Sequence, residues 1–532
     1  MSDTGAFALV LHTHLPYVRH PEHERPIEER WLHEALIECY LPLLDALDRL
    51  DSDGVRVRAT MSLTAPLAEM LRDDLLRARF DDHLARLDRF AARVAARRAY
   101  PAEFDAALGH ARGALIAARA RWDRIGGDVV GALVGHARRG SLQLLASSAT
   151  HAFLPGLLPR RPSLRAQLRL GVAAFERQTG LSARGLWLPE CGYDPGFDGE
   201  LAAAGVRMTI VDGHALLRAS RRPPFGVHAP VLSPSGVAFF GRDDASSRQV
   251  WAREVGYPGA LCYRDFYRDA GFDLDEALLD DQLGPFGVRL MSGLKLHRIT
   301  ERGPRKLHYI PDIARGQAAR DAAHFVGARR AQLGDLAATL PVRPLVVAPY
   351  DTELFGHWWA EGPWFLEAVF RELAAARDVE PVTLQDALAG RPALAECTPS
   401  ASSWGKGGYG EVWLDGESSE LWRHVHHASR EVERLVATHR RAEGLPGRAL
   451  DLAVRELLLL QSSDFPFILH TGGMVEYARA RVRSHVARVW RLSGIVTGER
   501  PQPDDERWVE DVDARDAFLR DLPSEALRAA FE

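Results

Sequence analysis

Short apolar runs recur along the first part of the chain and are separated by longer stretches with helical spacing. We expect strands at residues 7–11, 55–63, 142–148, 185–189, 208–211, 236–241 and 344–349. Nearly continuous apolar runs of this length are typical of parallel strands that are buried on both faces. Helical spacing predicts helices near 162–178, 311–338 and 362–377. The alternation of strands with helices predicts an α/β fold, built as a parallel sheet or as a β/α barrel.

Two long segments lack this alternation. Between about 67 and 138 the chain is rich in Ala, Leu and Arg at helical spacing, which predicts a helical insertion. Three long helical patterns occupy residues 416–497, with few strand signals. We therefore expect a first domain at 1–395, which contains the insertion and a long polar loop at about 241–273, and a C-terminal all-helical domain at 396–532.

Residues capable of chemistry follow four of the predicted strands. The four clusters are His12-Thr13-His14-Leu15-Pro16-Tyr17, Thr150-His151, Trp187-Leu188-Pro189-Glu190-Cys191-Gly192-Tyr193 and Pro349-Tyr350-Asp351-Thr352-Glu353-Leu354-Phe355-Gly356-His357-Trp358-Trp359. In a β/α barrel the carboxyl ends of all strands open on one face, so these clusters would converge there. This convergence favours the barrel over an open sheet.

Two of these clusters contain a carboxylate directly after an apolar strand, Glu190 and Asp351. Burial at such a place can tune the pKa of a carboxyl group. Two carboxylates on different strands supply the nucleophile and the acid/base that glycoside hydrolysis needs. Aromatic side chains support a sugar ligand, because their faces cover the apolar side of a pyranose ring. The tryptophans near or after the second carboxylate are Trp358, Trp359, Trp364, Trp404 and Trp413.

Other interpretations of the same residues remain open at this point. A Glu after a strand is often a helix cap or a member of an ion pair. His12 and His14 point to the same side of their strand, and with His151 and Asp351 they could bind a divalent metal in a metal-dependent hydrolase. A non-catalytic glycan-binding protein would keep the aromatic residues but would leave both strand-end carboxylates unexplained.

Composition narrows the class of protein and its surroundings. The formal net charge of −5 over 532 residues gives no reason to expect a nucleic-acid or membrane partner. The start of the chain lacks the basic residues and the long apolar run of a signal peptide. The four cysteines are widely spaced and form no C-x-x-C pair. We expect a reduced, cytoplasmic protein that acts as a monomer.

Three of the clusters together resemble the motifs of glycoside hydrolase family 57. The resemblance is carried by the clusters that begin at His12, Trp187 and Pro349. Within the family, the chain is similar to the 1,4-α-glucan branching enzymes in the stretch from Arg242 to Asp269 and in Gln461-Ser462-Ser463-Asp464-Phe465-Pro466-Phe467. The resemblance covers nearly the whole chain, from residue 6 to about 490.

The resemblance implies an incomplete (β/α)7 TIM-like barrel with a helical insertion and a C-terminal helical domain. It also implies cleavage of α-1,4-glucan and formation of α-1,6 branches by a retaining double displacement, with no metal or organic cofactor. By position in the motifs, Glu190 would be the nucleophile and Asp351 the general acid/base. The substrate-binding residues would be His12, His14, His151, Trp31, Tyr257, Trp359, Trp404, Trp413 and Asp464.

Tyr257 would lie on a mobile loop that covers the cleft, where it would help to exclude water. Within the same family, an α-amylase or a 4-α-glucanotransferase would share both carboxylates. Those two alternatives differ from a branching enzyme in the acceptor that receives the glucan chain.

Overall fold

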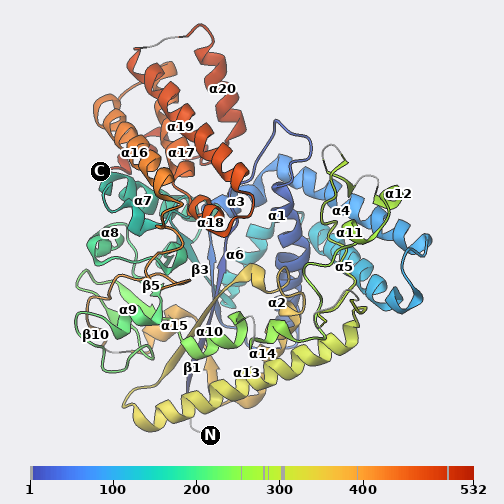
Figure 1. The fold of residues 1–532 in the computed structure, drawn as a ribbon. Helices are drawn as coiled ribbons and strands as arrows, with labels where there is room; N and C mark the ends of the chain where they lie inside the picture. The colour runs from blue at the N-terminus through green and yellow to red at the C-terminus, as the bar shows by residue number, and fades with distance from the viewer. Residues whose placement is uncertain are drawn as a thin grey trace.

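The structure is a computed structural model that describes residues 4–252, 255–279, 282–284, 287–300, 306–391, 393–499 and 502–532. Figure 1 shows the strands in the middle of the molecule, helices around them, and a bundle of C-terminal helices packed at one end. Residues 253 and 254 of the predicted polar loop lie outside the described residues. Of the helices in these ranges, none combines the length and the apolar character that crossing a bilayer requires.

In the described part of the chain, seven parallel strands form the central barrel. They are β1 (Gly5–Thr13), β2 (Ala59–Leu63), β3 (Leu142–Ser147), β4 (Leu186–Trp187), β5 (Met208–Val211), β7 (Ala238–Gly241) and β8 (Leu345–Asp351). One sheet has the order β4-β3-β2-β1-β8, and β5 pairs with β7 in the other. A bridge from Gly185 to Met208 joins β4 to β5, and the Asp243 N–H donates to the Val347 carbonyl, which joins β7 to β8. The expected incomplete (β/α)7 barrel is therefore confirmed.

Three further strands lie at the margins of this barrel. The two-residue β6 (Val231–Leu232) runs antiparallel to β7, and β10 (Ala395–Glu396) pairs with β6. The short β9 (Val379–Pro381) pairs with the first residues of β1. None of these strands was expected from the sequence, because two or three residues are too few to show a pattern.

Two strands are shorter than the sequence predicted. The strand predicted at 55–63 begins only at Ala59, since the preceding alternation of Val and Arg leads into the sheet without pairing. The strand predicted at 185–189 pairs only at Leu186 and Trp187. Pro189 cannot donate to a ladder, and a 3-10 turn at Pro189–Cys191 follows at once.

The alternation of side chains along β1 decides which residues face the barrel interior. Ala6, Ala8 and Val10 belong to the interior cluster, together with Trp187 and other strand residues. Phe7, Leu9 and Leu11 point outward, into the layer of helices. Because successive side chains of a strand point to opposite faces, His12 and His14 continue the inward-facing set at the carboxyl end of the strand.

The helices that cover the barrel include those expected from the sequence. These are α7 (Arg161–Thr179), α13 (Pro311–Thr339) and α14 (Gly362–Ala376). Between β1 and β2 lie α1 (Glu29–Ala35), a π-helix η1 (Leu36–Tyr40) and α2 (Leu41–Ser52), for which no element had been predicted. The shorter helices are α8 (Asp198–Ala203), α9 (Gly213–Leu217), α10 (Asp244–Trp251), α11 (Ala270–Asp273), α12 (Glu276–Leu279) and α15 (Leu384–Ala389).

Residues of the predicted insertion form four helices beside the barrel, drawn in blue in Figure 1. They are α3 (Ala65–Arg72), α4 (Asp74–Ala96), α5 (Asp105–Arg124) and α6 (Val129–Arg139). Asp73 caps α4 through the Leu76 N–H, and Asp128 caps α6 through the Gly131 N–H. These caps satisfy backbone donors that a helix start leaves open.

The C-terminal bundle contains α16 (Ser419–His439), α17 (Gly444–Leu460), α18 (Asp464–Thr471), α19 (Val475–Thr497), α20 (Asp505–Arg515) and α21 (Ser524–Ala529). The central helix, α17, is buried along most of its length. Residues before the bundle pack on the barrel, where Ser402 exchanges two backbone hydrogen bonds with Tyr193. The proposed domain boundary near residue 395 stays a prediction.

We predict that Gly356 is essential for the stability of the turn after β8. Its φ is +125°, and an added Cβ would meet the Glu38 carbonyl oxygen at 1.9 Å. Gly356→Ala should therefore lower the free energy of unfolding by roughly 2 kcal/mol or more, seen as a lower Tm in calorimetry. Gly473→Ala is the matched control, since no heavy atom lies within 4 Å of its Cβ position. Equal Tm values for the two variants would contradict this account.

Candidate active site

Backbone strain marks the carboxyl ends of two neighbouring strands. Seven non-glycine residues in the described chain have positive φ, and three of them are His151 (φ 56°), Glu190 (φ 63°) and Cys191 (φ 51°). Such conformations cost roughly 1–3 kcal/mol each and persist where the surrounding structure enforces them. They collect at functional sites, so Glu190 and His151 are the first candidates for chemistry.

The carboxylate of Glu190 is held by two donors that come from distant parts of the chain. The Trp404 Nε1–H donates to Glu190 Oε2 at 2.8 Å, and the Ser463 hydroxyl donates to Oε1 at 3.1 Å. The Trp404 backbone N–H also donates to the Glu190 carbonyl oxygen at 2.8 Å. The side chain of Glu190 is 14% exposed, so it can still meet a ligand.

Three histidine rings form a stack beside Glu190. The rings of His12 and His151 lie 4.8 Å apart, those of His14 and His151 lie 3.9 Å apart, and His12 also stacks on Trp187 at 4.5 Å. Each Nδ1 hydrogen-bonds to one hydroxyl, which for His12, His14 and His151 belongs to Ser62 (2.7 Å), Thr64 (2.9 Å) and Ser463 (2.8 Å).

Helix α18 places one carboxylate against this stack. His14 Nε2 lies 3.2 Å from Asp464 Oδ2. Burial and the neighbouring histidines hold the pKa of His12 and His151 well below its usual range. The rings of His12 and His151 are therefore neutral and can both donate and accept hydrogen bonds with sugar hydroxyls.

Asp351 is the last residue of β8, opposite His12 in the register of β1 and β8. Burial raises its pKa to about 8, the charge of Glu353 adds to this rise, and Arg242 opposes it. Burial likewise raises the pKa of Glu353, to about 7. The Tyr40 hydroxyl, at the end of the π-helix η1, donates to Glu353. Short π-helical segments are often found at functional sites.

The two candidate carboxyl groups interact electrostatically. Burial raises the pKa of Glu190 to about 8; the bond from Trp404 lowers it, and the charge of Asp351 raises it further. Among the described residues, no side chain hydrogen-bonds to the carboxyl group of Asp351, whereas two donors stabilise the anion of Glu190. Since hydrogen bonds to the charged form favour ionisation, these two donors favour the anion at Glu190 over the anion at Asp351.

The predicted tryptophans occupy three kinds of place. Trp404 contacts Glu190 and stands edge-on to Trp187 at 5.1 Å. Trp359 and Trp413 are each 2% exposed, with their rings packed in the core, so neither offers an open face to a sugar in this structure. Trp31 is partly buried and packs edge-on against Tyr477 at 6.0 Å.

Tyr257 lies on the barrel rather than near the carboxylates. Its hydroxyl hydrogen-bonds to His324 Nδ1 on α13 at 2.7 Å, and its ring packs against Phe365 of α14 at 5.6 Å. No described contact joins Tyr257 to Glu190 or Asp351 in this state. Its proposed place over the cleft stays a prediction.

The alternative of a metal site finds little support in the geometry. The donor atoms of His12, His14, His151 and Asp351 do not converge on one point, because the rings are stacked and each Nδ1 is bound to a hydroxyl. Two other groups in the described chain bring three possible ligands within 4.8 Å; they are Glu34, Glu38 and His357, and Glu456, His485 and Asp516. Arginine already pairs with each group, through Arg264 on Glu38 and Arg488 on Asp516.

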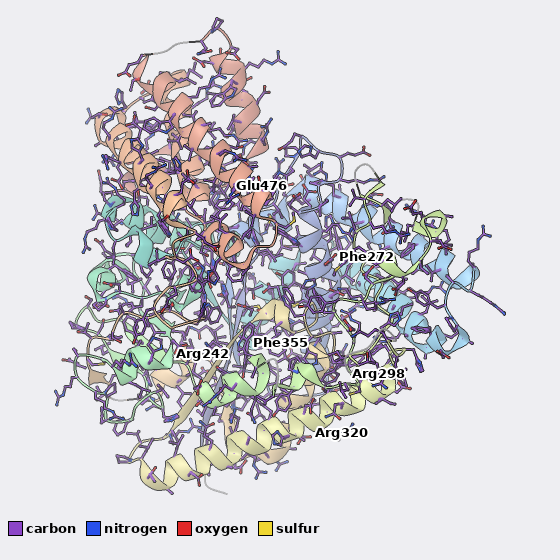
Figure 2. The ribbon with its side chains drawn as sticks, viewed as in Figure 1. Arg242, Phe272, Arg298, Arg320, Phe355 and Glu476 are labelled. Atoms are coloured by element: carbon purple, nitrogen blue, oxygen red, sulfur yellow. The ribbon has the colours of Figure 1, made fainter. Side chains whose placement is uncertain are left out.

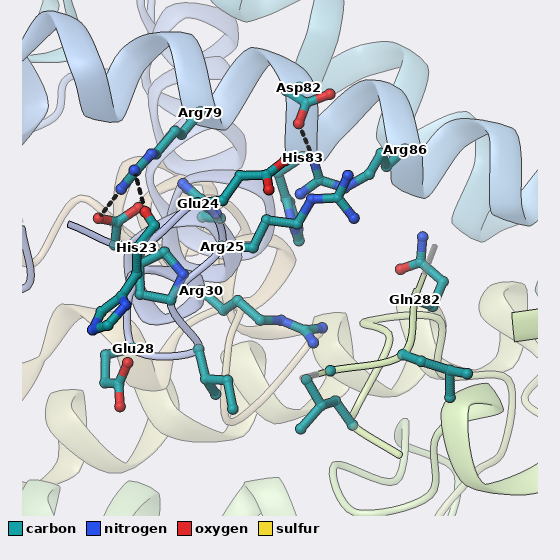
Figure 3. Close-up of a pocket in the computed structure, with 17 residues that line it drawn as sticks. His23, Glu24, Arg25, Glu28, Arg30, Arg79, Asp82, His83, Arg86 and Gln282 are labelled. Carbon is teal, nitrogen blue, oxygen red and sulfur yellow. Dashed lines mark hydrogen bonds and ion pairs between the residues drawn. The ribbon is translucent and has the colours of Figure 1, made fainter. Parts of the chain in front are cut away.

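A separate polar cavity of about 710 Å³ lies between α1, α4 and the segment that contains Gln282 (Figure 3). Its charged side chains pair with one another, as Arg79 does with Glu29 and Arg86 with Asp82. It contains neither of the candidate carboxylates. The candidate site is therefore placed at the carboxyl ends of the strands, where His151 and Glu190 meet.

Sequence patterns did not reveal every residue of this site. The carboxylates or histidines of the site also interact with Ser463, Glu353 and Tyr40. Arg242 directly follows β7 and is labelled in Figure 2. Its guanidinium lies 5.7 Å from the centre of the Trp404 ring. Arg242, Glu353 and Ser463 stood inside the quoted motifs, but a motif does not say which of its polar residues point into the site. Tyr40 belongs to a helix that had not been predicted.

A pair of buried carboxyl groups beside neutral histidines, at the carboxyl ends of the strands of a β/α barrel, is the arrangement of an enzyme of the glycoside hydrolase type. The family model of glycosyl hydrolase family 57 matches residues 8–250, and a model described as the C-terminal part of 1,4-alpha-glucan branching enzyme matches residues 424–526. The chain belongs to glycoside hydrolase family 57.

Relatives match both parts of the chain. A 1,4-alpha-glucan branching enzyme of Thermococcus kodakarensis is 31% identical over 97% of this chain and 77% of its own length, and its crystal structure superposes with a TM-score of 0.88. A probable 1,4-alpha-glucan branching enzyme of Mycobacterium tuberculosis is 32% identical over 93% of each chain. The crystal structure of an alpha-amylase from Thermotoga maritima superposes with a TM-score of 0.90 and 34% identity, over 98% of this chain and 99% of that one.

We predict that Glu190→Gln abolishes glucan cleavage and stabilises the protein selectively at high pH. The folded-state pKa of Glu190 lies at about 8, above the ordinary 4.5. The wild-type protein therefore loses stability as the pH rises from about 4.5 through about 8, because the unfolded chain releases this proton more readily. Glutamine cannot ionise, so the variant should gain roughly 3–4 kcal/mol relative to wild type between about pH 5 and pH 8.5.

Thermal unfolding at these two pH values, with an amylose cleavage assay, measures both effects. Glu420→Gln is the control, since the side chain of Glu420 is 77% exposed on α16. A difference in Tm between variant and wild type that does not change with pH would contradict the buried charge at Glu190.

Proposed function

We propose that this enzyme is a 1,4-α-glucan branching enzyme that works by a retaining double displacement. The observation that carries the proposal is the similarity over almost the whole chain to proteins named as branching enzymes, which includes the C-terminal helices. These helices supply Ser463 and Asp464 to the cleft. Both parts of the chain thus contribute to one site.

In the first step, ionised Glu190 attacks the anomeric carbon of an internal α-1,4 linkage. Protonated Asp351 donates its proton to the departing glycosidic oxygen, and a covalent glycosyl ester on Glu190 results. In the second step, Asp351 removes the proton from the 6-hydroxyl of another glucan, whose oxygen displaces Glu190. Retention needs the two carboxyl groups about 5–5.5 Å apart.

The remaining side chains orient the reactants. The neutral histidines His12 and His151, together with His14, would hydrogen-bond the sugar hydroxyls next to the scissile bond. Trp404 and Ser463 would stabilise Glu190 as it leaves in the second step, since both donate to its oxygens. Asp464 would fix the ring orientation of His14.

Hydrolysis of α-glucan is the second candidate function. The similarity in fold and sequence to the alpha-amylase of Thermotoga maritima favours it. Both candidate functions share the covalent intermediate, and they differ in whether a 6-hydroxyl or water attacks it. Branching and hydrolysis are therefore distinguished by their products and not by the carboxyl pair.

We predict that the enzyme forms α-1,6 linkages from amylose without added metal. Proton NMR of amylose incubated with EDTA-treated enzyme should show a growing α-1,6 anomeric signal. Shorter α-1,4 chains without this signal would support an amylase, and redistributed chains would support a 4-α-glucanotransferase. Activity that returns only after zinc is added would instead favour metal ligation by His12 and His14.

We predict that Tyr257→Ala reduces branching more than hydrolysis. The variant loses the bond to His324 and the packing on Phe365 that hold this segment on the barrel. A poorly placed loop should admit water to the covalent intermediate, so the ratio of new reducing ends to α-1,6 linkages should rise several-fold. His439→Ala, in the last turn of α16 and only partly buried, serves as control. An unchanged ratio would remove the loop from the mechanism.

A reduced compartment such as the cytoplasm fits the state of the cysteines. All four are free, and Cys39 and Cys191 are buried close to the two catalytic strand ends. Burial and nearby carboxylates raise the pKa of the Cys191 thiol well above its usual range. Such a thiol is unreactive at neutral pH.

A further inference from the structure

His214, on the short helix α9 after β5, has an acceptor at each of its two ring nitrogens. Nδ1 lies 2.9 Å from Asp212 Oδ1, and Nε2 lies 2.8 Å from the Gly408 carbonyl oxygen. A neutral imidazole has only one N–H. Both hydrogen bonds can therefore exist together only when His214 is protonated at both nitrogens.

The Gly408 carbonyl belongs to the loop that carries Trp404. It also accepts the backbone N–H of Ser403 at 2.8 Å, and the Ser403 hydroxyl accepts the Gly410 N–H at 2.7 Å. Trp404, the next residue, donates to both the backbone and the side chain of Glu190. One short path of hydrogen bonds thus leads from His214 to the nucleophile.

This loop has little conformational preference of its own. Four of its glycines adopt positive φ, namely Gly405, Gly407, Gly408 and Gly410, and glycine-rich segments gain entropy when they are released. At Gly408 an added Cβ would lie 2.9 Å from the His214 ring, which shows how closely the ring approaches the backbone. The loop therefore depends on bonds to the barrel for its conformation.

Asp212 also reaches Trp404 by a second path. Its Oδ2 accepts from Arg242 Nη1 at 3.2 Å, and the Arg242 guanidinium lies 5.7 Å from the centre of the Trp404 ring. Arg242 is further fixed by the Ser247 hydroxyl at 2.8 Å. The two paths from Asp212 meet at the residue that donates to Glu190.

We propose that protonated His214 is a positioning residue, which ties the 403–413 loop to the barrel and thereby holds the Trp404 donor on Glu190. Only the expected effect of this tie on glucan cleavage rests on the proposed function; the contact between the loop and the barrel does not. His214 touches neither the substrate nor the reacting atoms, and it acts through Gly408, Ser403 and Trp404.

The surroundings of His214 favour its protonated form. The hydrogen bond to Asp212 raises the pKa of His214 above its ordinary value, while burial and the charge of Arg218 oppose this. Burial alone would raise the pKa of Asp212, but the bond from His214 and the charge of Arg242 lower it. The ring of Tyr409, whose hydroxyl accepts from Arg218, covers His214 edge-on at 5.1 Å.

These contacts set the direction of the pH dependence. A histidine whose folded pKa is raised contributes its stabilisation fully at low pH and loses it as the pH rises through that pKa. The Gly408 tie should therefore be intact in mildly acidic solution and weaken in alkaline solution.

Two matched variants separate the two bonds. In His214→Asn the amide nitrogen can replace Nδ1 and keep the bond to Asp212, but it cannot reach Gly408. In His214→Gln the longer amide can replace Nε2 and donate to Gly408 without titrating. His439→Asn, in the last turn of α16 and only partly buried, controls for the loss of a histidine elsewhere.

Hydrogen exchange of the full-length protein measures the tie directly, and amylose cleavage measures its effect on catalysis. In His214→Asn we expect amides of 403–413 to exchange roughly tenfold faster than in wild type, after correction for intrinsic rates, with α17 unchanged. kcat should fall roughly tenfold with little change in KM. His214→Gln should restore both the slow amide exchange of 403–413 and the wild-type kcat. Between about pH 6 and pH 9 the protection of these amides should stay constant in His214→Gln, whereas in wild type it should fall.

Each outcome decides the proposal. Wild-type exchange in His214→Asn would overturn it, and so would His214→Gln being as unprotected as His214→Asn. If exchange follows the expected pattern but no protein, including wild type, cleaves amylose, the tie stands and the proposed function fails.

Discussion

The constraint on which the structure depends is the burial of two carboxyl groups, Glu190 and Asp351, at the carboxyl ends of the barrel strands. Burial raises the pKa of each carboxyl group to about 8, so ionisation of either group near neutral pH costs free energy. Two donors on Glu190 and none on Asp351 break this symmetry. The barrel, the strained corner at Glu190 and the packing of the C-terminal helices all serve to maintain that difference.

Because the donors on Glu190 come from residues 404 and 463, the catalytic state is a property of the whole chain. Trp404 belongs to the loop before the helical bundle, and Ser463 lies at the start of α18. The barrel alone would present Glu190 without either donor. The helices thus complete the active site as well as covering it.

The sequence predicted most of the barrel and both carboxylates, because buried strands and strand-end clusters leave a local pattern. It could not place Tyr40, His214 or Ser463, whose partners lie far away along the chain and are set by tertiary packing. It also could not tell Trp404, which donates to Glu190, from Trp359 and Trp413, whose rings are packed in the core. Residue type and spacing are the same in both cases; only packing differs.

Under the proposed function, the residues that cleave the glucan are separate from those that select the acceptor. Similarity to both branching enzymes and an alpha-amylase is then expected. In the proposed mechanism, cleavage and formation of the glycosyl ester need only the carboxyl pair, the histidines and the donors on Glu190, and these parts suit either product. The acceptor is chosen afterwards, by whatever keeps water from the ester until a 6-hydroxyl arrives. We propose that this choice depends on how the glycine-rich 403–413 loop and the turn that carries Tyr257 are held on the barrel. In this proposal, specificity depends on how firmly these segments are tied to the barrel, a property that overall identity and superposition do not measure.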